Sequence, residues 1–154
     1  MKNKIIVPNL ALSECIKSRT AIKYGIDNTP NIAELEAIKL TAEKIFTPIR
    51  EHFNVPIHIS SFFRCPELNS TIGGSTTSAH CLGLAMDIDQ DNKNSKVTNK
   101  MIFDYIRGNM EFDQLINEYD YSWVHIGIRP DQKDNRNQVM RAIKRNGKTV
   151  YEAM

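Results

Sequence analysis

The segments LAMDID (84–89) and SWVHIGI (122–128) alternate aliphatic residues with polar, small or aromatic ones. An alternation of period two is typical of β-strands that have one buried face. It places residues such as Met86 and Ile126 on the core side of the sheet and turns Asp87 and His125 to the other side. We therefore expect two strands that carry a carboxylate and an imidazole on the face away from the core.

Further elements surround these two strands. DQLINE (113–118) is a third strand candidate, and its short connection to SWVHIGI through residues 119–121 predicts an antiparallel hairpin. VPIHISS (55–61) is a fourth candidate. We expect short helical pieces over 9–25, a capped helix from Asn31 that Pro48 ends or kinks, a loop with one helical turn over 64–78, and a helix over 98–108. Strands flanked by segregated helices indicate an α+β fold with a small antiparallel sheet.

Length and composition predict one ordinary globular domain. The chain has 154 residues, of which 41% are hydrophobic and 25% charged, so we expect a single domain over 1–154. No apolar run approaches the ~20 residues of a membrane span. The three cysteines are scattered and odd in number, and the N-terminus resembles no signal peptide. We therefore expect synthesis and folding in the cytoplasm, without a membrane segment.

Positive charge gathers near the C-terminus. Residues 129–148 contain seven Lys and Arg side chains and only two Asp side chains, although the whole chain has a net charge of only +2. Such a segment can attract an anionic polymer. A solvated, partly frayed tail over 129–154 is the simpler expectation, and a role in binding nucleic acid is the weaker alternative.

His80, Asp87 and His125 are the candidate metal ligands. A catalytic zinc site takes three protein ligands and leaves one position for water or substrate, and two imidazoles with a carboxylate suit it. The spacing alone is weak evidence, because the same residue types recur by chance in ordinary strands. His52, His58 and the cysteines form no comparable pattern.

The run SAHCLGLAMDID (78–89), followed by WVHI (123–126), resembles the two metal motifs of the zinc D-alanyl-D-alanine carboxypeptidase family of bacterial cell-wall peptidases. It is most similar to the compact, single-domain type of phage lysis enzymes and murein hydrolases. ISSFFRCPELN (59–69) and FDQLINE (112–118) resemble flanking segments of that family. The resemblance extends over about residues 10–128.

The resemblance implies the small α+β fold that this family shares with hedgehog signalling domains. It implies one Zn²⁺ ion held by His80, Asp87 and His125, with Arg64 contacting the substrate and Ser78 forming hydrogen bonds near the site. The implied activity is hydrolysis of peptidoglycan stem peptides, as a D-Ala-D-Ala carboxypeptidase or a murein endopeptidase. A monomer that reaches the cell wall after phage-mediated release, as an endolysin does, fits these implications.

One position departs from the family pattern. Many relatives carry an acidic general base three residues before the second histidine, where this chain has Ser122. A serine cannot act as that base. Glu118 matches an acidic residue of the compact subgroup and is the first choice, Asp120 is the second, and Asp89 can act as a partner of the ligands. If none of them serves, the chain is a non-catalytic zinc-binding module of a phage particle or wall-associated protein.

Overall fold

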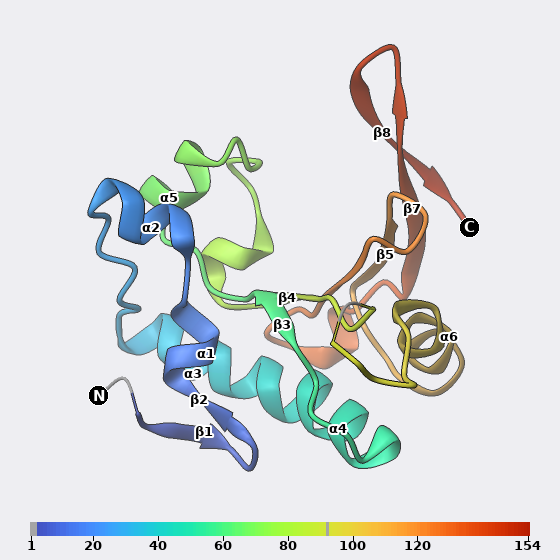
Figure 1. Ribbon diagram of the computed structural model, residues 1–154, viewed down its shortest axis with the longest axis horizontal. Helices are drawn as coiled ribbons and strands as arrows, with labels where there is room; N and C mark the ends of the chain where they lie inside the picture. The colour runs from blue at the N-terminus through green and yellow to red at the C-terminus, as the bar shows by residue number, and fades with distance from the viewer. Residues whose placement is uncertain (1–2, 92) are drawn as a thin grey trace.

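The computed structural model describes residues 3–91 and 93–154. They form a six-stranded sheet, a separate two-stranded sheet and several helices (Figure 1). The strands are β1 (Ile5–Val7), β2 (Leu10–Ala11), β3 (Ile59–Ser61), β4 (Ala85–Ile88), β5 (Gln114–Glu118), β6 (Trp123–Gly127), β7 (Gln138–Arg145) and β8 (Lys148–Ala153). The helices are α1 (Leu12–Ile16), α2 (Arg19–Tyr24), α3 (Ile32–Thr41), the π-helix η1 (Ala42–Phe46), α4 (Thr47–Phe53), α5 (Pro66–Thr71), the 3₁₀-helix η2 (Ala79–Leu82), α6 (Asn99–Asn109) and the 3₁₀-helix η3 (Gln132–Asp134).

The large sheet has the strand order β3-β4-β6-β5-β7-β8. All neighbouring strands are antiparallel except β5 and β7, which run parallel. The expected α+β class is confirmed, whereas a purely antiparallel sheet is wrong. The reason is that β6 ends beside the start of β5, with Gly127 opposite Gln114. The connection from β6 therefore passes the start of β5. Strand β7 begins there as well, with Gln138 opposite Gln114, so it runs in the same direction as β5.

The C-terminal segment is not the frayed tail that the sequence suggested. β7 and β8 form a long hairpin that extends the sheet. Five of the seven basic side chains between residues 129 and 148 contact carboxylates: Arg129 and Arg136 pair with Asp113, Lys133 with Asp131, and Arg141 and Arg145 with Glu152. The segment is ordered because cross-strand side-chain contacts stabilise β7 and β8 in the sheet. Most of its positive charges also pair with nearby carboxylates.

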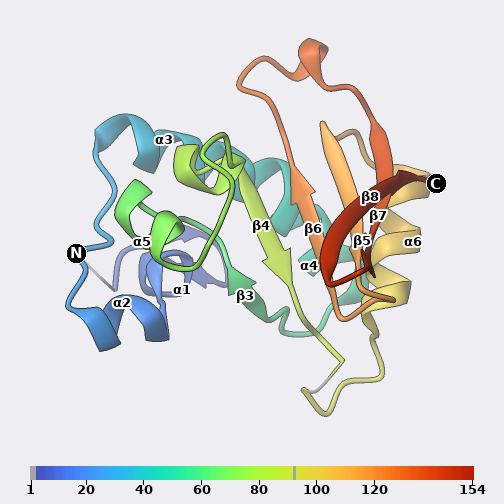
Figure 2. The same cartoon turned by 90° about the horizontal axis from the view of Figure 1, so that it is seen from above.

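The core lies between the sheet and the helices α3, α4 and α6, which cover the same face of the sheet (Figure 2). Met86, Ile88, Val124 and Ile126 are fully buried there, as the alternation predicts. The capping box at Asn31 is confirmed, since Asn31 Oδ1 accepts from Glu34 N–H at 2.8 Å and Glu34 Oε1 accepts from Asn31 N–H at 2.8 Å. No helix among the described residues is long and apolar enough to cross a membrane.

Pro48 does not end the helix. The chain continues from α3 through η1 into α4, and Pro48 occupies the first turn of α4. A proline lacks the N–H that an uninterrupted helix would bond to the carbonyl four residues earlier. The wider π-helical turn directly before it changes the bonding locally, since Thr47 N–H donates to the Ala42 carbonyl. The helical segment thus passes the proline and reaches Phe53.

Candidate metal centre and active site

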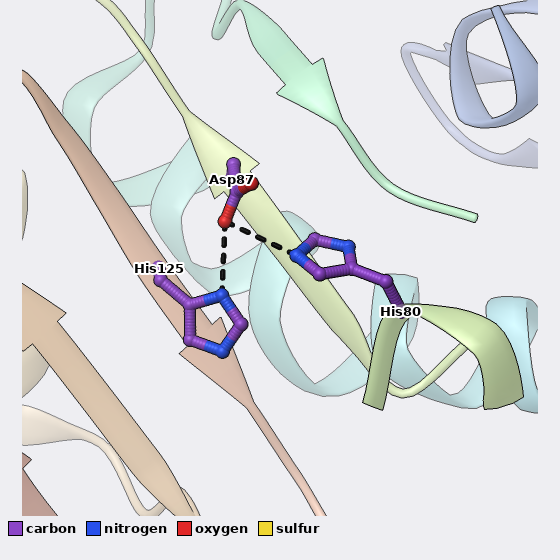
Figure 3. Close-up of side chains that lie close together, drawn as sticks. All are labelled: His80, Asp87 and His125. Atoms are coloured by element: carbon purple, nitrogen blue, oxygen red, sulfur yellow. Dashed lines mark hydrogen bonds and ion pairs between the residues drawn. The ribbon is translucent and has the colours of Figure 1, made fainter. Parts of the chain in front are cut away.

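Asp87 and His125 lie opposite one another on the neighbouring strands β4 and β6. Their side chains project from the face of the sheet that is opposite the covering helices (Figure 3). Asp87 Oδ1 lies 2.9 Å from Nδ1 of His125. The sequence alternation predicted this shared face. Successive side chains of a strand point to opposite faces, and both residues alternate with aliphatic residues of the core.

His80 comes from the short helix η2 and points at the same carboxylate (Figure 3). Its Nε2 lies 3.3 Å from Asp87 Oδ1. Its Nδ1 lies 2.6 Å from the carbonyl oxygen of Phe62, which only accepts, so Nδ1 carries a proton. In the neutral imidazole Nε2 is then the nitrogen that offers a lone pair to a metal. The sequence could not reveal the Phe62 carbonyl as the group that orients His80, since a main-chain acceptor leaves no signal in residue identity.

Gly83 sets the entry from η2 into β4. Its φ of +75° is a left-handed conformation that glycine adopts without strain. A Cβ atom built on it would meet the Glu34 carbonyl oxygen at 2.9 Å and the Ile38 backbone nitrogen at 3.2 Å. The close packing against α3, reinforced by a 2.8 Å hydrogen bond from Thr41 Oγ1 to the Gly83 carbonyl, fixes where η2 places His80.

The three side chains form a group that could hold a metal ion. Their potential ligand atoms all lie within 4.8 Å of one another, and His80 and Asp87 are buried. Burial alone raises the pKa of the Asp87 carboxyl, but the charge of His80 and hydrogen bonds to both imidazoles outweigh it and hold this pKa well below its usual range. A carboxylate that stays ionised beside two imidazole nitrogens is the donor set expected of a zinc ligand cluster.

Glu118 ends strand β5, directly opposite Trp123 of β6. It is buried. Burial raises the pKa of its carboxyl to about 7, the charge of His125 lowers it, and the charge of Asp87 raises it further. Glu118 therefore lies within the electrostatic reach of two of the three candidate ligands, and its proton affinity suits exchange near neutral pH.

The other acidic candidates have different surroundings. Asp120 is exposed in the turn between β5 and β6, where residues 119–121 all have positive φ. Asp89 follows β4, and its Oδ1 accepts a 3.1 Å hydrogen bond from Asn99 of α6. Ser122 is exposed, and its hydroxyl donates to the Tyr119 carbonyl at 2.7 Å. Ser122 thus holds the turn, and neither aspartate belongs to the group of three.

Arg64 and Ser78 lie on the His80 side of the group. Arg64 follows β3, whose Ser61 pairs with Asp87. Its guanidinium donates long hydrogen bonds of 3.4 Å to the hydroxyls of Ser61 and Ser78, and Ser78 also caps η2 by accepting from His80 N–H. Burial lowers the pKa of Arg64, whereas the charge of Asp87 raises it. Its buried Nε has no partner within the described chain.

Comparison with known proteins agrees with this geometry. The family model described as Peptidase M15 matches residues 8–127. That range contains the three candidate ligands, Arg64, Ser78 and Glu118, and it ends with strand β6. A search of the curated proteins found no match.

Proposed function

The chain belongs to the peptidase M15 family, and we propose that it is a zinc-dependent peptidase that hydrolyses the stem peptides of peptidoglycan. The observation that carries the proposal is the convergence of His80, Asp87 and His125, with ligand atoms within 4.8 Å of one another. Three ligands from η2, β4 and β6 leave the fourth position of a tetrahedral zinc site open, as catalytic sites require.

The donor set fits zinc. In the neutral imidazole, Nδ1 of His80 donates to the Phe62 carbonyl, which leaves Nε2 as the nitrogen that can bind a metal. The lowered pKa of Asp87 keeps its carboxyl ionised. When bound, Zn²⁺ supplies Lewis acidity to the scissile carbonyl and to water. The protein supplies a rigid sheet and a buried position for two of the three ligands.

Glu118 is the proposed general base. Its carboxylate accepts a proton from the attacking water as the water oxygen bonds to the carbonyl carbon. The same carboxyl then gives a proton to the peptide nitrogen as the C–N bond breaks. A pKa of about 7 suits both transfers, because the group holds and releases a proton with little cost near neutral pH.

Arg64 is the proposed substrate anchor. Its Nη atoms hold only long contacts to two serine hydroxyls, so the planar fork can turn to a better acceptor. A peptide carboxylate or the developing oxyanion of the scissile carbonyl provides one. Ser78 would orient the guanidinium by accepting its hydrogen bond. By accepting from the His80 N–H it also caps η2, the helix that carries the first ligand.

The finer assignment follows the sequence resemblance. We propose that the bond cleaved lies in a murein peptide, by D-Ala-D-Ala carboxypeptidase or endopeptidase action, and that the enzyme meets its polymer at the cell wall after phage-type release. The loops beside the ligands set the choice of bond. Mass spectrometry of peptidoglycan digested by the zinc-loaded protein reports activity and the bond cut together.

A matched pair of variants tests the metal group. His80→Ala removes one ligand and should abolish peptide release. His52→Ala alters a histidine of α4 that stacks on Tyr105 with ring centroids 3.8 Å apart, and it should leave release unchanged. Turnover by His80→Ala at the wild-type rate would contradict the proposal. Zinc binding without turnover of any peptidoglycan peptide by the wild type would favour a non-catalytic zinc-binding module.

A further inference from the structure

The C-terminal hairpin β7–β8 lies beyond the residues that the family model matches, yet it stands beside the proposed active site. Strand β7 pairs with β5, which carries Glu118, and β8 pairs with β7. The hairpin rises on the side of the sheet opposite α4 and α6, and β8 lies in front of the sheet when these helices lie behind it (Figures 1 and 2). Asp87 and His125 project from that same side (Figure 3).

The register places one hairpin side chain in line with Glu118. Ala142 lies opposite Glu118, and Tyr151 lies opposite Ala142. Residues paired across neighbouring strands share a face, so Glu118 and Tyr151 project from the face that bears the metal ligands. Two strand spacings, about 10 Å, separate their backbones. The intervening residue is only an alanine, which leaves room for the longer side chains to approach each other above it.

Burial and charge support this closeness. Ala142 is fully buried, although the covering helices lie on the other face of the sheet. Burial raises the pKa of the Tyr151 phenol, and the charges of Glu118, Tyr119 and Asp87 raise it further. The phenol therefore stays protonated near neutral pH and remains a hydrogen-bond donor.

The Tyr151 hydroxyl is unused within the described chain. Tyr119, its neighbour in the same region, bonds its hydroxyl to Thr149 Oγ1 at 2.5 Å. Tyr151 has no such partner among the described residues, and it is 54% exposed. Strand β8 thus presents an exposed hydrogen-bond donor. In the order of the strands, it lies beyond Glu118 of β5 as seen from the metal ligands on β4 and β6.

We propose that Tyr151 is a substrate-binding residue of the active site, and that its hydroxyl donates a hydrogen bond to the peptide backbone beside the scissile bond. The inference rests on the proposed peptidase function and extends it. The peptide would lie between Arg64 on the β3 side of the ligands and Tyr151 on the β8 side. The hairpin then forms a wall of the binding site that the matched part of the chain does not supply.

Tyr151→Phe tests the proposal, with Tyr24→Phe as its matched control. The change removes only the hydroxyl, and Tyr24 at the end of α2 has a similar exposed fraction of 59%. With the peptide that the wild type cleaves, kcat/KM of Tyr151→Phe should fall by roughly 3- to 10-fold, the worth of one hydrogen bond. Tyr24→Phe should match the wild type, and both variants should keep the wild-type zinc content and Tm.

Binding gives a second readout that does not depend on turnover. In a Glu118→Gln background, calorimetric titration with the stem peptide should show a Kd weakened by a similar factor when Tyr151→Phe is added, and no change when Tyr24→Phe is added. Equal kcat/KM and Kd for the two tyrosine variants would overturn the assignment of Tyr151 alone. A loss of zinc or of Tm in Tyr151→Phe would show a structural role and overturn it as well. If the wild type neither binds nor cleaves stem peptides, the proposed function itself fails.

Discussion

Glu118 and Asp120 are two residues apart and have opposite surroundings. Glu118 is buried and feels the charges of His125 and Asp87, whereas Asp120 is exposed in the following turn. We expect Glu118→Gln to lower turnover of the stem peptide by roughly 10²–10⁴-fold, because a positioned general base contributes about that much. Zinc content, measured by atomic emission, should stay near that of the wild type, since the amide leaves the ligands intact.

Asp120→Asn is the control for this substitution and should change kcat/KM by less than about 2-fold, since a solvent-screened charge acts weakly at a distance. Loss of turnover in Asp120→Asn with an active Glu118→Gln would assign the base to the turn instead. Full activity in both variants would direct attention to Asp89.

The raised pKa of Glu118 has a consequence for stability in the zinc-free protein. The folded chain holds this proton more tightly than the unfolded chain, whose glutamate has its ordinary pKa of 4.5. The stability that the neutral carboxyl provides is complete below that value and is lost as pH rises through about 7. The wild type should therefore lose unfolding free energy between pH 5 and pH 8, whereas the amide of Glu118→Gln cannot ionise and loses none by this route. The unfolding free energy of Glu118→Gln minus that of the wild type should increase by roughly 1–3 kcal/mol over this pH range.

Urea unfolding in the presence of a chelator measures this difference. Glu111→Gln, at an exposed glutamate, is the control and should show no such growth. A constant difference between Glu118→Gln and the wild type over the same pH range would mean that the folded protein does not raise the pKa of Glu118.

At the scale of elements, the contact between Gly83 and α3 controls the position of η2. Gly83→Ala must place a Cβ atom 2.9 Å from the Glu34 carbonyl oxygen and hold a positive φ of 75°. We expect a loss of about 2–4 kcal/mol in the free energy of unfolding. Because η2 carries His80, the affinity for zinc should fall too, as a competition titration with a chromophoric chelator would show.

Gly108→Ala is the matched control. Gly108 is exposed within α6, and nothing lies within 4 Å of a Cβ built there. Alanine should raise the unfolding free energy by about 0.5–1 kcal/mol through helix propensity and leave zinc affinity unchanged. Equal stability and zinc affinity for the two alanine variants would show that α3 does not constrain η2.

The elements also show where sequence patterns are informative. Alternation in residues 84–89 and 122–128 predicted the shared face of Asp87 and His125, because a strand has a fixed period of two. The position of His80 followed from a family motif and not from periodicity, since a 3₁₀-helix of four residues has no pattern to detect. The hairpin β7–β8 was missed because its abundant Lys and Arg resemble a solvated tail, although the β-branched and aromatic residues of TVY (149–151) were available as a strand signal. Its parallel pairing with β5 depends on where β6 ends, which no local pattern encodes.

At the scale of the whole molecule, one row of paired residues crosses the entire sheet through the site. Ser61, Asp87, His125, Ile116, Met140 and Ala153 lie side by side on the six successive strands. The ligands thus come from segments that meet only in the folded sheet, and the unfolded chain has no preformed site. A metal bound only by the folded state stabilises it by mass action.

This coupling predicts a chelator effect on stability that depends on pH. Imidazoles must be neutral to bind zinc, and protons compete for them below about pH 6. The Asp87 carboxylate does not add to this competition, because its pKa lies well below its usual range. In calorimetric scans, chelation should therefore lower the Tm at pH 7.5 by several degrees and change it little at pH 5. His80→Ala should have nearly the same Tm with and without chelator at both pH values. A chelator effect of equal size at pH 5 and pH 7.5 in the wild type would mean that the metal is held by other groups than two imidazoles and one carboxylate.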